Sequence, residues 1–364
     1  MYRQGAHLLD EAGGLVAEFG RRALVVADGR VRDLYGSRLT AALRRASVEA
    51  AFSGFSGETS PDELDRRAAI GRAERCDVVI GLGGGKAQDG AKAVKRTLDI
   101  PIVVVPTVAA SDAATSRLAI TYTDEGEFLG PLFMRTNPDA ILVDTAIITN
   151  APVRFFIAGI GDALSTLFEA EQCRISGATN FFDARPTQAA LAIAERCFRT
   201  VWDEAEQAVR DVCRRRVTEA VERVVEANIL LSGIGFEGCG VAAAHAISQG
   251  FTRIPELSGA LHGEEVAVAL LSQLVLEGRG EEYLTDVFDF YRRVGIPGSI
   301  RMLGLSEPRS DHYEEIARFA CRIGSRVHNM ASRVTADAVV AALRTVEALA
   351  MHLLPDNASR CDDR

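Results

Sequence analysis

The chain has 364 residues, of which 48% are hydrophobic and 25% charged, enough for two ordinary globular domains. Its net charge of −9 argues against nucleic acid or an anionic membrane as the main partner, although a surplus of acids also serves plain solubility. The sequence contains no run of about 18 apolar residues and starts without a signal-peptide pattern, so we expect no membrane span.

The cysteines form no recognisable framework. There are seven, none of them in a CxxC pair, at positions 76, 173, 197, 213, 239, 321 and 361. An odd and scattered set is typical of free thiols in a reducing compartment, rather than of a disulfide scaffold or a zinc finger. We therefore expect a cytoplasmic protein with free thiols.

The first half of the chain alternates between short apolar runs and helical stretches. The runs predict strands at 22–28, 48–55, 77–83, 101–107 and 140–144. The helical stretches lie at about 35–46, at 61–76 and within 83–98. Residues 118–134 interrupt the rhythm with two apolar runs around 124–127, which predicts a β-hairpin. Alternation of this kind is typical of a parallel sheet covered on both faces.

The second half has a different character. From about residue 145, Ala, Leu, Glu and Arg dominate, and helical spacing continues to about residue 353. We see no strand alternation there. The sequence therefore predicts an α/β domain followed by an all-α domain.

A glycine-rich stretch, GLGGGK at 81–86, connects a predicted strand to a predicted helix. Glycines let a backbone approach a phosphate closely, the helix N-terminus favours its negative charge, and Lys86 adds a cation. The stretch matches neither the GxGxxG fingerprint nor a Walker A loop, so a structural turn is an equal alternative. Asp28 ends the first predicted strand, where an acid accepts hydrogen bonds from ribose hydroxyls and repels a 2′-phosphate. This favours NAD over NADP, with a helix cap as the alternative role.

Three residues are candidate metal ligands. Asp162 lies early in a predicted helix with apolar surroundings, His245 in an Ala-rich helical stretch, and His262 at the start of an apolar helix. One carboxylate and two imidazoles hold a divalent metal and leave a coordination position for substrate. Each residue alone has a structural alternative, either a hydrogen-bonded core histidine or a first-turn acid that complements the helix dipole. They form no local motif, so spacing alone does not establish the site.

Several long blocks together resemble the glycerol dehydrogenases, a branch of the iron-containing alcohol dehydrogenase superfamily. The strongest blocks are GGGKAQDGAKAV (83–94), PTVAASDAATSRLAITYTDEGEF (106–128), residues 137–170 containing GIGDALSTLFEA, AAAHAISQGFTRIPE (242–256), LHGEEVA (261–267) and VHNM (327–330). The resemblance covers nearly the whole chain. It implies the dehydroquinate synthase-like, iron-containing alcohol dehydrogenase fold, with a Rossmann-like NAD-binding α/β domain over 1–150 and an all-α metal-binding domain over 151–364.

The resemblance also implies a reaction, in which glycerol or a related vicinal diol is oxidised to the hydroxyketone with NAD and a bound divalent metal. It implies that Asp162, His245 and His262 bind the metal and that Asp112 contacts the substrate. The NAD contacts that it implies are Asp28, Gly84, Gly85, Lys86, Asp89, Thr107, Ser116, Leu118 and Tyr122. It further implies a homo-oligomer acting on a small-molecule alcohol.

Two positions distinguish this chain within the superfamily. Iron-type relatives carry a further His four residues after the metal-binding Asp, where this chain has Thr166. Three protein ligands favour Zn²⁺ over Fe²⁺. Glycerol dehydrogenases often carry a His- and Tyr-rich segment before the HGE motif, where this chain has Leu-Ser-Gly-Ala-Leu at 257–261. The pocket is therefore expected to be less aromatic and less polar, which leaves glycerol, another vicinal diol and a hydroxycarboxylate as substrates.

Two other classes of protein are alternatives. Dehydroquinate-synthase-like cyclases share this fold, NAD and a metal, but they resemble one another in having Glu where this chain has Asp162. They also need several basic side chains around a phosphorylated substrate, and between 237 and 270 the chain has only Arg253 besides its two histidines. A binding protein without catalysis is the second alternative, against which stand the three ligands and the glycine-rich stretch.

Overall fold

The chain folds into two compact units in the computed structural model, which describes residues 1–55, 58–126 and 128–354. The first unit comprises Met1–Ala151 and Arg214–Glu222, and the second comprises Pro152–Cys213 and the chain from Arg223 onward. Glu127 of the predicted hairpin and Cys361 lie outside the described residues.

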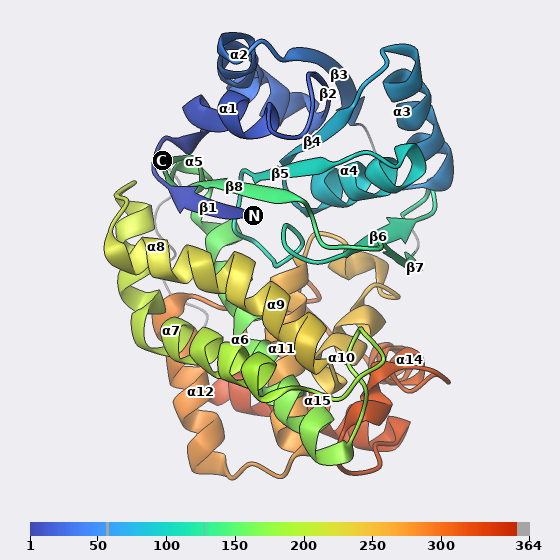
Figure 1. The fold of residues 1–364 in the computed structure, drawn as a ribbon. Coiled ribbons are helices and arrows are strands. Elements are labelled where there is room, and N and C mark those ends of the chain that lie inside the picture. The colour runs from blue at the N-terminus through green and yellow to red at the C-terminus, as the bar shows by residue number, and fades with distance from the viewer. Residues whose placement is uncertain (56–57, 127, 355–364) are drawn as a thin grey trace. The chain divides into compact units, whose positions relative to one another are not determined.

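A six-stranded sheet forms the centre of the first unit, and every neighbouring pair of strands in it is parallel (Figure 1). The strand order is β1-β8-β5-β4-β2-β3. The strands are β1 (Tyr2–Gly5), β2 (Arg22–Asp28), β3 (Glu49–Phe55), β4 (Val78–Gly83), β5 (Ile102–Pro106) and β8 (Ala140–Asp144). The predicted bounds of these strands lie within one residue of the observed bounds, except for β1, which was not predicted. That strand was missed because it is a four-residue edge strand with no buried residue and no apolar run.

Helices cover both faces of this sheet. One face packs against η1 (Leu8–Glu11), α1 (Ala12–Val16) and α2 (Gly29–Arg45), where Leu15 and Leu39 join Val25 and Ile80 in one core. The other face carries α3 (Pro61–Ala73) and α4 (Gly85–Leu98). A short helix, α5 (Thr145–Asn150), follows β8. Strands β6 (Leu118–Tyr122) and β7 (Phe128–Phe133) form the predicted antiparallel hairpin.

Residues 214–222 belong to the first unit, although they are distant in sequence from the rest of it. The amide of Gln4 on β1 donates to the carbonyl oxygen of Glu222 at 2.7 Å and to its carboxylate at 2.8 Å. The hydroxyl of Thr145 donates to the same carboxylate at 2.7 Å. The segment 214–222 is therefore an integral part of this unit.

Asp144, at the end of β8, ties the N-terminal segment to the sheet. Its fully buried carboxylate accepts hydrogen bonds from the backbone N–H groups of His7 and Leu9, at 2.9 and 3.0 Å, and of Ala146 at 3.1 Å. Asp144→Ala leaves these groups without their acceptor, so we expect the free energy of unfolding to fall by about 3 kcal/mol. Urea unfolding measures this loss. The same substitution at the exposed Asp33 is the control, and an equal loss in both variants would contradict the assignment.

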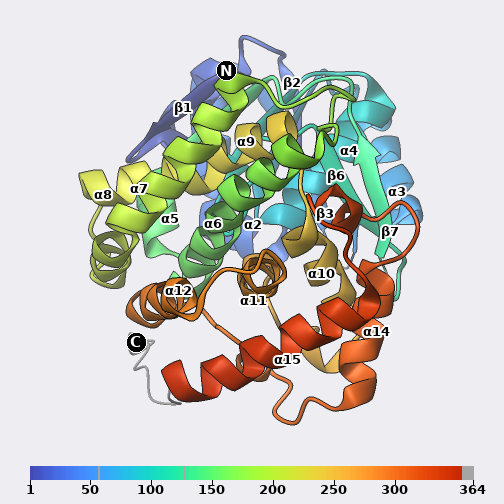
Figure 2. The same cartoon turned by 90° about the horizontal axis from the view of Figure 1, so that it is seen from below.

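Among its described residues, the second unit contains helices and connecting loops but no strand, as predicted (Figure 2). Its longer helices are α6 (Val153–Ser176), α7 (Gln188–Cys213), α10 (Ala243–Phe251), α11 (His262–Leu276), α12 (Glu281–Val294), α14 (Ser310–Ala320) and α15 (Ala336–Leu353). Helix α8 (Glu219–Glu226) continues through a π-helical turn, η2 (Ala227–Leu231), into α9 (Ser232–Cys239). Short elements are η3 (Pro255–Leu257), α13 (Ile300–Leu303) and η4 (Arg326–Asn329).

Helix α11 lies at the centre of this unit. It packs against α6, α10 and α15, and Figure 2 shows it among these helices. A common core joins Ile247 and Phe251 of α10, Val268 of α11, Ile316 of α14 and Leu343 of α15. This packing brings α6, α10 and α11 together, and each of them carries one predicted metal ligand.

No single helix among the described residues is long and apolar enough to cross a membrane. The helices Glu219–Cys239 and Ala243–Phe251 reach that length and composition only as a pair bent by 108°. The side chains of Val224, Ile229 and Ile247 in this pair are buried in the core.

The cysteines follow the prediction in part. Five are free thiols, at positions 76, 173, 197, 239 and 321. The expectation of free thiols is confirmed at these five positions.

Candidate metal centre

Asp162, His245 and His262 meet at one place in the second unit. One ligand atom of each side chain lies within 4.8 Å of those of the other two. The Nε2 atoms of His245 and His262 each lie 3.7 Å from Oδ1 of Asp162, and the two ring centroids are 5.5 Å apart. Helix packing therefore brings together the three residues that the sequence singled out.

The donor atoms of this trio fit a divalent metal. One carboxylate oxygen and two imidazole nitrogens form a set that Zn²⁺ and neighbouring transition metals accept. Tetrahedral coordination at bond lengths of about 2.0–2.2 Å separates ligand atoms by about 3.4 Å. The observed separations of 3.7 Å are close to that value, so a small movement of the side chains suffices to coordinate an ion.

The burial of the three ligands is graded. The side chain of Asp162 is 1% exposed, that of His245 16%, and that of His262 49%. Asp162 lies nine residues into α6, which begins at Val153, so the alternative of a first-turn acid is wrong. Because the helix dipole acts mainly within the first turn, it does not account for this buried carboxylate.

Two glycines bring the backbones that carry Asp162 and His262 into contact. A Cβ atom on Gly161 would lie 2.6 Å from the carbonyl oxygen of Gly263 and 2.9 Å from the Cβ of Ala267. No residue with a side chain fits at Gly161 unless α6 and α11 move apart. The neighbours of these glycines, Asp162 and His262, are consequently held at ligand distance.

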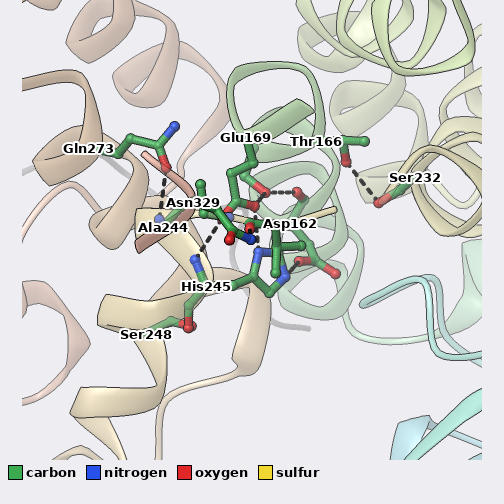
Figure 3. Close-up of polar contacts among 12 residues, drawn as sticks. Asp162, Thr166, Glu169, Ser232, Ala244, His245, Ser248, Gln273 and Asn329 are labelled. Carbon is green, nitrogen blue, oxygen red and sulfur yellow. Dashed lines mark hydrogen bonds and ion pairs between the residues drawn. The ribbon is translucent and has the colours of Figure 1, made fainter. Parts of the chain in front are cut away.

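Glu169, which sequence reasoning missed, supports His245 (Figure 3). Its fully buried Oε2 lies 2.5 Å from Nδ1 of His245. Burial opposes ionisation of this carboxyl, but electrostatic attraction to His245 and hydrogen bonds from His245 and Ala242 together lower the pKa of Glu169. The signal in the sequence was its spacing. Asp162 and Glu169 are seven residues apart, which places both on one face of a helix.

The start of α10, just before His245, is held by side chains from other elements. Gln273 of α11 accepts a hydrogen bond from the backbone N–H of Ala244 at 2.8 Å (Figure 3). The amide of Asn329, in the VHNM block, donates to the carbonyl oxygen of Val241 at 2.7 Å. These contacts fix the backbone from which His245 projects.

An ion pair holds the segment before His262. Arg154 of α6 donates to both carboxylate oxygens of Glu264, at 2.7 and 2.6 Å, and to the carbonyl oxygen of Gly259 at 2.9 Å. Glu264 also accepts from the backbone N–H of Leu261 at 2.9 Å. The segment 257–261, whose sequence differs from that of the family that the chain resembles, is thereby anchored to α6.

Thr166 stands apart from the ligand trio. Its hydroxyl lies 3.1 Å from that of Ser232 on α9, and both residues are buried (Figure 3). The position where iron-type relatives carry a further His is therefore used here for packing between α6 and α9.

The glycine-rich stretch and Asp28 lie in the first unit. Gly84 is the N-cap of α4, and Cβ atoms on Gly84 and Gly85 would make only ordinary contacts, at 3.5 Å to Val108 and 3.8 Å to Ala113. Packing therefore does not require glycine at these two positions. Asp28 caps α2, which was the alternative role considered for it. Its Oδ1 accepts a hydrogen bond from the backbone N–H of Val31 at 2.8 Å. Its Oδ2 points to the glycine-rich stretch, 3.7 Å from a Cβ built on Gly83.

A buried ion pair organises the rest of this region. Asp89 lies 2.8 Å from Nζ of Lys92 and accepts from the backbone N–H of Ile120 at 3.0 Å. Lys92, which sequence reasoning also missed, is 1% exposed and donates to the carbonyl oxygens of Ala113, at 2.8 Å, and Leu118. The pair therefore holds the segment 113–120 against α4.

The other predicted NAD contacts also belong to the first unit. Lys86 lies 2.5 Å from Oε1 of Glu58 and 5.9 Å from the ring centre of Tyr122. The backbone N–H of Thr107 donates to the carbonyl oxygen of Gly83 at 3.1 Å. Ser116 is buried. Asp112 belongs to a turn in the same unit, where its carbonyl oxygen accepts from the N–H of Thr115 at 3.0 Å.

Known proteins are similar to this chain in fold and in sequence. Residues 1–145 match the family of iron-containing alcohol dehydrogenases. The chain is 40% identical over 355 residues to a glycerol dehydrogenase of Escherichia coli O6:H1, which covers 98% of this chain and 97% of that protein. It is 37% identical over 346 residues to a glycolaldehyde reductase of Halobacterium salinarum, covering 95% of each. The crystal structure of a probable glycerol dehydrogenase from Sinorhizobium meliloti 1021 has a TM-score of 0.92 and 36% identity, over 96% of this chain and 97% of that one.

Proposed function

The chain belongs to the glycerol dehydrogenases within the iron-containing alcohol dehydrogenases, and from that premise we propose that it oxidises a vicinal diol with NAD as the hydride acceptor. It is an oxidoreductase with an Asp/His/His metal triad. The convergence of Asp162, His245 and His262 from three helices is the observation that carries the proposal.

We propose Zn²⁺ as the metal held by this trio. A bound divalent metal supplies Lewis-acid stabilisation of the charge that develops on the substrate oxygen. Three protein ligands leave a coordination position open, and the hydroxyl of Thr166 is engaged with Ser232 rather than with the trio. Direct metal analysis distinguishes Zn²⁺ from Fe²⁺.

We propose that the first unit binds NAD through residues within 1–150, and that the metal domain is the second unit, which lies within 151–364 and excludes the segment 214–222. The N-terminus of α4 favours a pyrophosphate, and close approach of that group explains the glycines at 84 and 85. Asp28, which points to this stretch, accepts hydrogen bonds from ribose. The further proposed contacts are Lys86, Asp89, Thr107, Ser116, Leu118 and Tyr122 for NAD, and Asp112 for substrate. We also propose that the protein is a homo-oligomer.

Asp28→Ser separates the two roles of Asp28. Serine is an equally good N-cap, so the hydrogen bond from Val31 and the melting temperature are expected to be retained. Loss of the carboxylate is expected to raise the KM for NAD about tenfold, the value of one hydrogen bond to a charged group. The ratio of kcat/KM with NAD to kcat/KM with NADP is also expected to fall. Steady-state kinetics with both cofactors measure this, and an unchanged KM and preference would contradict the ribose contact.

The proposed substrate class follows from the relatives. Glycerol is a vicinal diol, and the reduction of glycolaldehyde, a hydroxyaldehyde, produces one, so a vicinal diol is the alcohol form in both reactions. Ser258, Gly259 and Ala260 precede His262 and offer no aromatic surface to a larger polyol. We therefore propose a small vicinal diol as the substrate.

A screen of NAD reduction over glycerol, ethane-1,2-diol, propane-1,2-diol and 2-hydroxy acids tests the proposal, together with metal analysis of the same sample. The expected result is net NADH with a vicinal diol and a metal-containing protein. Removal of the metal by a chelator is expected to abolish turnover, and Zn²⁺ to restore it. Phosphate release from a sugar phosphate without net NADH would instead indicate a cyclase.

A further inference from the structure

We propose that Glu169 is a positioning residue of the metal centre, whose carboxylate holds His245 in the tautomer and orientation that present Nε2 as a ligand. The proposal deepens the proposed function, since it rests on a metal being bound by the trio. Glu169 itself is outside the trio and touches none of the reacting atoms.

The contact between Glu169 and His245 determines where the imidazole carries its proton. Oε2 of Glu169 lies 2.5 Å from Nδ1 of His245. An ionised carboxylate only accepts hydrogen bonds, so Nδ1 carries the hydrogen in this contact. In the neutral ring, which is the form that binds a metal, Nε2 then keeps its lone pair, and this is the atom that lies 3.7 Å from Oδ1 of Asp162. The ring is therefore presented to a metal in its ligating form.

The same carboxylate fixes the backbone from which the ring projects. Oε1 of Glu169 accepts hydrogen bonds from the backbone N–H of Ala242 at 2.8 Å and of His245 at 3.0 Å. Ala242 is the N-cap of α10 and has no side-chain cap of its own, so Glu169 supplies that cap from α6. One fully buried side chain thus sets the start of the helix, the position of His245 and the direction of its ring.

Glu169→Gln distinguishes positioning from simple packing. The amide has the same shape, and its oxygen is able to accept the backbone hydrogen bonds that Oε1 accepts now. Its NH₂ group only donates, so it meets Nδ1 of His245 favourably only when that nitrogen has lost its hydrogen. The hydrogen then moves to Nε2, and the ring no longer binds a metal through that atom. A role limited to helix capping would leave metal binding intact.

Titration of the metal-free protein with Zn²⁺ in competition with a chromogenic chelator tests the proposal. We expect the Kd for Zn²⁺ to rise 10–100-fold in Glu169→Gln, as is typical for partners of metal-binding histidines. Glu347→Gln is the matched control. Glu347 is another buried carboxylate of the second unit and accepts from the backbone N–H of Ile300, and its replacement is expected to keep wild-type affinity for Zn²⁺. Wild-type affinity in Glu169→Gln would overturn the proposal.

A second measurement uses the unsubstituted protein and does not depend on the folding of any variant. ¹⁵N spectra of the histidine-labelled, metal-free protein report which ring nitrogen of His245 carries hydrogen. We expect the hydrogen on Nδ1, and a hydrogen on Nε2 would overturn the proposal. If the wild-type protein binds no metal, the proposed function fails, while the tautomer of His245 still decides the role of Glu169.

Discussion

Replacing His262 by alanine is expected to remove the bound metal and to lower kcat/KM by about 10³-fold, the rate equivalent of several kcal/mol of transition-state stabilisation. His262 is one of three ligands, and a site with two ligands holds a metal weakly. The fold is expected to survive, because the side chain is 49% exposed and its truncation removes little buried surface.

Metal analysis, steady-state kinetics and the melting temperature, measured on one preparation, test this expectation. His352→Ala is the control, since it removes an exposed imidazole from α15 of the same unit. The control is expected to keep both metal and activity. Full activity in a metal-free His262→Ala protein would contradict metal assistance altogether.

Gly161→Ala is expected to weaken metal binding by tenfold or more and to destabilise the protein by about 1–3 kcal/mol, the usual cost of overpacking. The added methyl group would lie 2.6 Å from the carbonyl oxygen of Gly263. That oxygen belongs to the backbone of α11, so the contact is relieved only if the two helices separate. Asp162 and His262, adjacent to these glycines, then move apart.

Zn²⁺ titration and urea unfolding measure the two effects of Gly161→Ala. Gly14→Ala is the control, because Gly14 lies inside α1 and a Cβ there meets no atom within 4 Å. Alanine at this position is expected to leave metal binding unchanged and to stabilise the helix by roughly 0.5–1 kcal/mol. Unchanged Zn²⁺ affinity in Gly161→Ala would show that the glycine contact does not set the ligand spacing.

The sheet of the first unit was predictable from the sequence for a physical reason. Strands β2, β4 and β5 are covered on both faces, so each consists of a continuous apolar run that ends at a turn. Strand β1 lies at the edge of the sheet and pairs only with β8, so its residues need not be apolar. Its place is set by hydrogen bonding to a strand more than a hundred residues away, which local patterns do not record.

The metal centre was predictable only in part. Asp162, His245 and His262 are 83 and 17 residues apart, and their meeting depends on how three helices pack. The spacing of these residues did not identify them as ligands of one metal, whereas the resemblance of long blocks to a family did. Glu169 and Lys92 were missed because a charged residue in a helix usually lies on the solvent-exposed face. Their burial follows from tertiary packing alone.

The segment 214–222 has a consequence for how this protein can be divided. The chain passes between the two units at three points, after residues 151, 213 and 222. A fragment that ends at residue 151 lacks Glu222 and therefore the acceptors for Gln4 and Thr145. The gene thus encodes the first unit in two separate pieces. A chimaera that exchanges this unit between relatives must carry both pieces, and one recombination crossover cannot transfer it without also transferring residues 152–213 of the second unit.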